Sequence, residues 1–186
     1  MTSLKGTSTP DEAVEVAYRV VDSPVGPLLL AATPAGLAEI AFANHGVEPL
    51  LHALAGRVSP RLVESPERLD RAAAQLEKYF DGRRTQFDLA LDLRVSGTFR
   101  RAVLERLREV SFGSTTTYRA LAAAAGRPQA VRAVGSACAT NPLPIVIGCH
   151  RVLRSDGGLG GYAGGLGVKQ FLLDLEAGQA RNRPGS

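Results

Sequence analysis

Two adjacent side chains in the C-terminal half of the sequence could carry out covalent chemistry together. Cys149 is one of two cysteines, and His150 is one of three histidines. A cysteine attacks as its thiolate, and a nearby imidazole can accept the thiol proton. Neighbouring side chains usually point apart, so a direct hydrogen bond between the two is not assured, although one bridging water could link them. A second interpretation stays open, in which Cys149 is a small apolar residue at the end of a buried segment.

The residues around this pair suggest how it would be held. The run "PIVI" (144–147) predicts a buried extended segment that ends at Gly148. Asn141 opens the turn pair "NP", which would join this segment to the preceding helix. Arg151 follows the histidine and would either favour a thiolate or pair with an acid. A nucleophile at the end of a rigid segment is a sensible arrangement for catalysis.

Two features farther along the chain could complete a site. Glu176 ends the apolar helix "FLLDLE" and could orient a histidine, although most such carboxylates are solvated helix ends. The run "GGLGGYAGG" (157–165) could bring backbone close to a ligand, with Tyr162 as its one large side chain. The ordinary interpretation of this run is a surface loop.

The N-terminal half has the pattern of strands. Three short β-type runs lie within 16–42, separated by the turn signals "SPVGP" and "TPAG". Apolar residues at helical spacing predict a helix over 67–82, and apolar alternation predicts a half-buried strand over 85–93. We therefore expect a small antiparallel β-sheet domain with one helix over 14–93. Both ends, 1–13 and 179–186, are expected to be disordered.

The pattern turns helical from residue 94. Thr98 and Thr117 are predicted to cap two helices, Gly126 ends the second, and a third is predicted over 128–139 with Pro128 near its start. Two helices joined by a short turn have the outline of a helix-turn-helix. We predict an α/β (α+β) protein whose C-terminal helical domain, 94–178, holds this motif and the cysteine.

Composition and charge narrow the function classes. The 186 residues are 45% hydrophobic and 22% charged, with no apolar run of membrane-spanning length and no apolar core of a secretion signal at the start. Two cysteines exclude a disulfide framework or a four-cysteine zinc site, so we expect a cytoplasmic protein without metal or cofactor. Residues 1–94 hold 10 Lys and Arg against 13 Asp and Glu, whereas 95–186 hold 12 against 5. A basic C-terminal half suits a nucleic-acid partner.

A long run of motifs in one register resembles a known family. The segment is "TTTYRALAAAAGRPQAVRAVGSACATNPLPIVIGCHRVLRSDGGLGGYAGGLGVKQFLLDLE", and "SPVGPLLLAATPAGL" is a weaker echo near the N-terminus. Together they resemble the O6-alkylguanine-DNA alkyltransferases, also called methylated-DNA–protein-cysteine methyltransferases. The resemblance implies DNA repair by a single irreversible transfer of the alkyl group to Cys149, after the damaged base is flipped out of duplex DNA. It also implies a monomer in solution, with self-association on DNA left open.

The resemblance assigns roles to individual residues. His150 would take the thiol proton of Cys149 through a water, Glu176 would stabilise the imidazolium, Asn141 would position the water, and Tyr118 would bind and protonate the leaving guanine. Arg132 would fill the gap left by the flipped base. The other residues implied in DNA binding are Arg119, Arg127, Ala133 and Gly135, and those implied in the substrate pocket are Cys138, Val152, Tyr162 and Ala163.

Departures from the family pattern keep other functions open. Gly148 replaces the usual proline before the cysteine, which would loosen the backbone there, and Leu104 replaces a usual tryptophan. The alternatives are a sensor of alkylated DNA with weak or no transfer, a helix-turn-helix regulator with an inert cysteine, and a cysteine hydrolase. No specific signal for an oxyanion hole supports the last of these.

Overall fold

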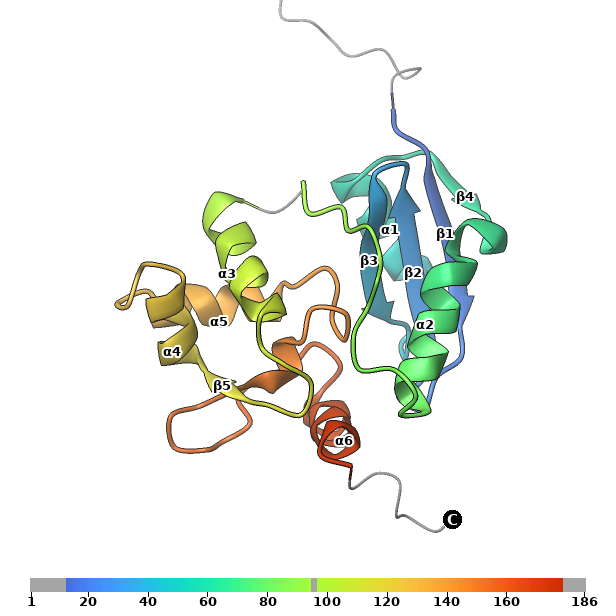
Figure 1. Ribbon diagram of the computed structural model, residues 1–186. Helices are drawn as coiled ribbons and strands as arrows, with labels where there is room; N and C mark the ends of the chain where they lie inside the picture. The colour runs from blue at the N-terminus through green and yellow to red at the C-terminus, as the bar shows by residue number, and fades with distance from the viewer. Residues whose placement is uncertain (1–12, 95–96, 179–186) are drawn as a thin grey trace, which may run out of the picture.

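The computed structural model describes residues 13–94 and 97–178. The termini predicted to be disordered, 1–13 and 179–186, lie outside these ranges apart from Ala13. Figure 1 shows two groups of elements: a sheet with helices α1 and α2, and a group of helices α3 to α6. The α/β class expected from the sequence is confirmed.

The N-terminal part is built on a four-stranded sheet. Strands β1 (Val16–Val21), β2 (Leu28–Thr33) and β3 (Gly36–Phe42) form the predicted antiparallel meander. A short fourth strand that was not predicted, β4 (Leu62–Glu64), pairs with β1 in parallel, giving the order β3-β2-β1-β4. Three residues are too few to show a period, and their partner strand lies far away in sequence.

Helices cover the two faces of this sheet. The predicted helix is present as a 3₁₀ turn, η2 (Pro66–Leu69), followed by α2 (Asp70–Phe80), and it packs on Leu28 and Leu30. Helix α1 (Glu48–Arg57) was not predicted, because only Leu54 of this helix is buried and the apolar stripe is correspondingly weak. Leu54 contacts the opposite face of the sheet.

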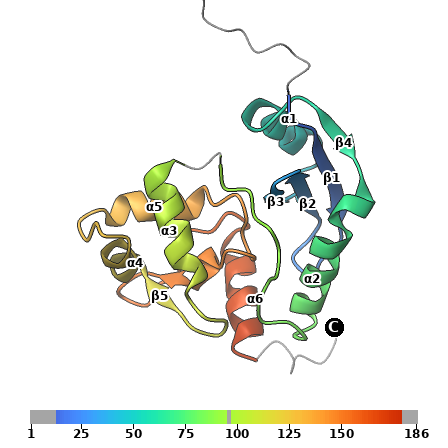
Figure 2. The same cartoon turned by 45° about the horizontal axis from the view of Figure 1, so that its top comes forward.

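The strand predicted over 85–93 was wrong. The segment is extended, but its only bridge joins Leu91 to Leu37. Elsewhere a side chain takes the place of a partner strand, because the amide of Gln75 bonds both the N–H and the C=O of Asp88, each at 2.9 Å. The alternation itself is real, since Phe87 packs on Tyr79. Figure 2 shows this segment running between the two parts of the molecule.

The C-terminal part contains short helices linked by irregular segments. Its elements are α3 (Thr98–Arg108), β5 (Thr116–Thr117), α4 (Tyr118–Ala124), α5 (Val131–Ala139), η3 (Cys149–Arg151), β6 (Val152–Leu153) and α6 (Leu166–Glu176). Strands β5 and β6 pair in parallel. Helices α4 and α5, joined by a turn, have the helix-turn-helix outline, and α3 packs against both.

Two of the predicted helix boundaries were wrong, whereas the cap at Thr117 and the stop at Gly126 after α4 were confirmed. The hydroxyl of Thr117 accepts a hydrogen bond from the Ala120 N–H at 3.1 Å, so it caps α4 as expected. Thr98 does not cap α3, because it is the first helical residue and Gly97 has the cap position. The third helix begins at Val131 and not at 128, since a turn closed between Arg127 and Ala130 holds Pro128.

Gly36 tests the contact between the sheet and the extended segment. Its φ is +143°, and a Cβ there would lie 2.4 Å from the carbonyl oxygen of Ala90. We expect Gly36→Ala to lower the free energy of unfolding by about 2 kcal/mol or more, measured by urea denaturation. Gly56→Ala, an exposed helical control with open space around it, should be neutral or stabilising by about 0.5–1 kcal/mol. Equal effects of the two changes would contradict this account.

Candidate active site

A buried carboxylate gathers the residues around the candidate nucleophile. Oε1 of Glu176 accepts hydrogen bonds from the Tyr79 hydroxyl at 2.8 Å, from His150 Nε2 at 2.7 Å and from Arg151 Nη2 at 2.9 Å. Oε2 accepts from Arg151 Nε at 2.9 Å and from the Gly113 N–H at 3.0 Å. All lone-pair directions of the carboxylate are therefore used within the protein.

This arrangement fixes the charge of Glu176 and the tautomer of His150. Burial alone would raise the pKa of Glu176, but the hydrogen bonds from His150 and Arg151 outweigh it and hold that pKa well below its usual range. Burial lowers the pKa of His150, although Glu176 opposes this effect. Because the partner of Nε2 is an ionised carboxylate, Nε2 carries the hydrogen and Nδ1 has the free lone pair. Among the described residues Nδ1 has no hydrogen-bond partner.

Cys149 sits at the start of η3, directly before this histidine. Its side chain is buried, with 3% of the residue exposed. Burial raises the pKa of the Cys149 thiol to about 11, against the opposing effects of Asn141 and Lys169. The thiol is therefore neutral near pH 7, and its conversion to a nucleophile requires a base.

Asn141 closes the turn that presents the cysteine. Its Oδ1 accepts from the Leu143 N–H at 3.0 Å, and its Nδ2 donates to the Ile147 carbonyl at 2.9 Å. Between Leu143 and Ile147, the residue Ile145 has a φ of +75°. The Ile147 N–H donates a hydrogen bond to the carbonyl of Leu143. The extended segment predicted over 144–147 was thus wrong. The segment is buried as expected, but Asn141 supplies the hydrogen bonds that a partner strand would have supplied.

A buried lysine anchors the segments on the other side of the site. Lys169 is completely buried on α6 and donates to the carbonyl of Val152 at 2.6 Å and to that of Leu159. It therefore ties β6 and the glycine-rich loop to the helix that ends in Glu176. Sequence reasoning gave no role to Lys169 or Tyr79. The available signal was a polar group on an otherwise apolar helix face, which requires a partner when buried.

A pocket opens between α4, α5 and the glycine-rich loop. Its lining includes Tyr118, Arg132, Gly135, Tyr162 and Ala163, all of them predicted site residues. The Tyr162 ring lies 6.3 Å from the His150 ring, and burial raises its pKa well above the usual value. The pocket therefore lies next to the hydrogen-bonded pair of Glu176 and His150.

The remaining residues predicted to bind DNA or line the pocket are not part of its lining. Cys138 and Val152 do not line it, because both are buried in the core. Arg119, Arg127 and Ala133 are exposed on or between α4 and α5, and the Arg127 guanidinium lies over the Phe99 ring at 5.2 Å from its centroid. Of the two roles considered for Arg151, favouring a thiolate or pairing with an acid, the structure shows the second, because Arg151 forms an ion pair with Glu176.

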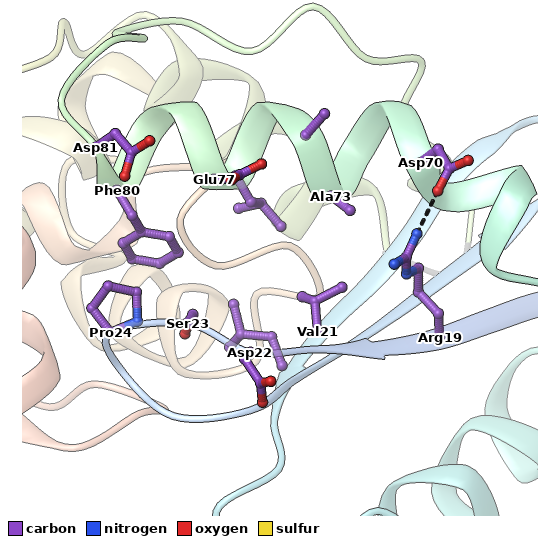
Figure 3. A pocket seen from close by; sticks show the side chains of 13 residues that line it. Arg19, Val21, Asp22, Ser23, Pro24, Asp70, Ala73, Glu77, Phe80 and Asp81 are labelled. Atoms are coloured by element: carbon purple, nitrogen blue, oxygen red, sulfur yellow. Dashed lines mark hydrogen bonds and ion pairs between the residues drawn. The ribbon is translucent and has the colours of Figure 1, made fainter.

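A second hollow lies between α2 and the end of β1. Figure 3 shows Phe80 and Pro24 on its wall and Asp22, Glu77 and Asp81 around it. It contains no cysteine or histidine, so it is not a candidate for the same chemistry. Across residues 13–94 and 97–178 there is no group of three or more His, Cys, Asp or Glu side chains placed to bind a metal ion. Within the same ranges no helix is long and apolar enough to span a membrane.

Comparisons with known proteins show the family to which this chain belongs. Residues 98–178 match the family model described as 6-O-methylguanine DNA methyltransferase, DNA binding domain, and residues 16–93 match its ribonuclease-like domain. The chain belongs to the 6-O-methylguanine DNA methyltransferase family. The family predicted from the sequence is thereby confirmed, and with it the class of enzyme, a DNA-repair methyltransferase.

Relatives match over almost their whole length. The methylated-DNA–protein-cysteine methyltransferase of Methanosarcina barkeri is 41% identical over 165 residues, which cover 88% of this chain and 99% of that protein. Its counterpart in Mycolicibacterium paratuberculosis is 42% identical, with coverages of 87% and 92%. A crystal structure of Mycobacterium tuberculosis OGT in complex with DNA has a TM-score of 0.77 and 36% identity, covering 88% of this chain and 94% of that one.

Asn141 is predicted to hold the active-site turn. In Asn141→Ala the Leu143 N–H and the Ile147 carbonyl lose their partners while they remain buried, so we expect a loss of about 2–3 kcal/mol in the free energy of unfolding by urea denaturation. The matched control is Thr140→Ala, which removes an exposed hydroxyl bonded to the Ser136 carbonyl and should cost less than about 1 kcal/mol. Similar losses in both variants would show that the turn does not depend on Asn141.

Proposed function

We propose that this protein repairs O6-alkylguanine in double-stranded DNA by transferring the alkyl group irreversibly to Cys149, once per molecule. The observation that carries the proposal is the buried Glu176–His150 pair, which leaves Nδ1 of the imidazole without a partner among the described residues, next to a neutral thiol in the sequence. A weak nucleophile and a base held in one tautomer are the two components that such a displacement needs.

In the proposed reaction His150 accepts the thiol proton through one water, which Asn141 helps to position, and Glu176 stabilises the imidazolium that forms. The sulfur–carbon bond forms as the bond between the alkyl carbon and guanine O6 breaks, and the released electron pair passes to the guanine. Tyr118 supplies a proton to the leaving base and regains one from solvent. The product is a thioether at Cys149, and since a thioether is a poor leaving group, the protein is not regenerated.

The pocket supports base flipping as the means of access. Guanine O6 is inside the duplex stack, so the base must leave the stack before it can meet a buried sulfur. Arg132 is exposed on α5 at the edge of the pocket and would occupy the gap in the duplex. The other proposed DNA contacts, Arg119, Arg127, Ala133 and Gly135, lie on or beside α4 and α5. Tyr162 and Ala163 would contact the flipped base.

The proposal extends to the setting of the reaction. We propose a two-domain organisation, 14–93 and 94–178, in which the basic C-terminal domain binds DNA and the protein acts as a monomer in the cytoplasm. The net positive charge of the C-terminal half of the sequence supports DNA binding by this domain. Sedimentation with and without a duplex tests whether the protein self-associates on DNA.

Transfer to Cys149 can be measured directly. After incubation with a duplex containing O6-methylguanine, we expect intact mass to show one added methylene group per chain, located on Cys149 by peptide mapping. Cys149→Ser should abolish the gain, whereas the matched control Cys138→Ser should retain it, because Cys138 has no histidine relay beside it. Binding of the damaged duplex without any mass gain would contradict transfer and indicate a sensor of alkylated DNA.

Arg132 is predicted to act on the DNA and not on the chemistry. In Arg132→Ala we expect transfer from duplex DNA to slow by about tenfold to a hundredfold, while the reaction with a free O6-alkylguanine base stays near the parent rate. The control Arg61→Ala removes a half-exposed arginine from the N-terminal part and should change neither rate. Equal slowing with DNA and free base would argue against a role in base flipping.

A further inference from the structure

We infer that Tyr79 is a positioning residue for alkyl transfer: its hydroxyl sets how strongly Glu176 holds the His150 imidazole, so the N-terminal part of the fold tunes the base in the C-terminal part. The inference rests on the proposed function of His150 as the base. Tyr79 is 97 residues from Glu176 in the sequence, and neither the predicted site nor the proposed reaction includes it.

The geometry leaves the Tyr79 hydroxyl one orientation. The residue is completely buried, and its ring packs on Phe80, Phe87 and Phe112 at centroid distances of 5.5, 5.4 and 6.0 Å. These contacts come from both sides of the junction between the two parts, so the ring cannot swing away from Glu176. The hydroxyl donates to Oε1 at 2.8 Å, and the same oxygen accepts from His150 Nε2 at 2.7 Å.

Three donors on one oxygen, the Tyr79 hydroxyl, His150 Nε2 and Arg151 Nη2, compete for its negative charge. The O–H of Tyr79 draws electron density from Oε1, which weakens the attraction of that oxygen for the N–H of His150 and for an imidazolium. Without the hydroxyl, Glu176 would bind the imidazolium more tightly, and the pKa of His150 would rise. The neutral, proton-accepting form of His150 would then be lost at a higher pH.

The other charged and titratable groups near this pair stay in place when the hydroxyl is removed. Arg151 contacts both oxygens of Glu176, and the Gly113 N–H contacts Oε2. Lys169 and Cys149 act on His150 or on each other through space, and the Tyr162 ring lies against His150 at 6.3 Å. None of them bonds to Tyr79, so a shift in Tyr79→Phe reports on the hydroxyl.

The test compares the pH profile of transfer in Tyr79→Phe with that of the parent protein. We expect the acid limb of the rate, where activity falls as His150 takes a proton, to move to higher pH by about 0.5–1 unit. A residue that served only for packing would lower the rate at every pH and leave the limb in place. Tyr18→Phe is the matched control, since it removes a hydroxyl from the same part of the protein away from Glu176, and it should not move the limb.

A second readout does not depend on transfer. In nitrogen-15 NMR at neutral pH, the ring N–H of His150 should move downfield in Tyr79→Phe, because its hydrogen bond to Glu176 strengthens, and stay unchanged in Tyr18→Phe. The chain has three histidines, so His150→Gln assigns the signal. If Tyr79→Phe changes neither the His150 ring N–H resonance nor the acid limb of the pH–rate profile, the inference is overturned. If the parent protein transfers no alkyl group, the proposed function fails, and the resonance alone decides whether Tyr79 acts on the pair.

Discussion

The structure depends on one buried ion, the carboxylate of Glu176. Removing an isolated carboxylate from water costs several kcal/mol, and this cost is offset only when hydrogen bonds occupy the oxygens. Glu176 receives five hydrogen bonds from Tyr79, Gly113, His150 and Arg151. Those donors come from α2, the segment before β5, and η3. The need to keep this charge satisfied therefore constrains how the sheet, the irregular segments and the last helix can sit together.

The same principle explains why the active-site segments can do without regular structure. Backbone groups buried outside helices and sheets still require partners. Asn141 supplies them for the turn before Cys149, Lys169 for the carbonyls of Val152 and Leu159, and Gln75 for Asp88. Each of these side chains is a buried polar group fixed by the backbone that it bonds. The segments around Cys149 and the pocket are thus held by a small number of polar side chains, which leaves their backbone free to adopt turns.

This division also explains what the sequence could predict. Alternation and helical spacing located β1 to β3, α2 and the C-terminal helices, because those patterns follow from burial on one face. The strand predicted over 85–93 and the extended segment predicted over 144–147 were wrong, because Gln75 and Asn141 replace a partner strand and no local pattern reveals such a substitution. Tyr79 fell correctly on an apolar face, yet the acceptor of its hydroxyl lies 97 residues away. The family motifs brought Cys149, His150 and Glu176 together, whereas spacing alone could not.

Gly148 gains a different meaning from these contacts. Because Gly148 replaces the proline that is usual in the family, the sequence predicted a loosened backbone before Cys149. Its φ of −67° is open to any residue, so the backbone does not require glycine. A Cβ at this position would lie 2.8 Å from Nε and Cζ of Arg151, so any other residue would require the Arg151 side chain to shift. Arg151 folds back over Gly148, bonds Glu176 through two nitrogens and reaches the Val110 carbonyl at 2.7 Å. The Arg151 guanidinium therefore lies between the backbone before Cys149 and the carboxylate that bonds His150.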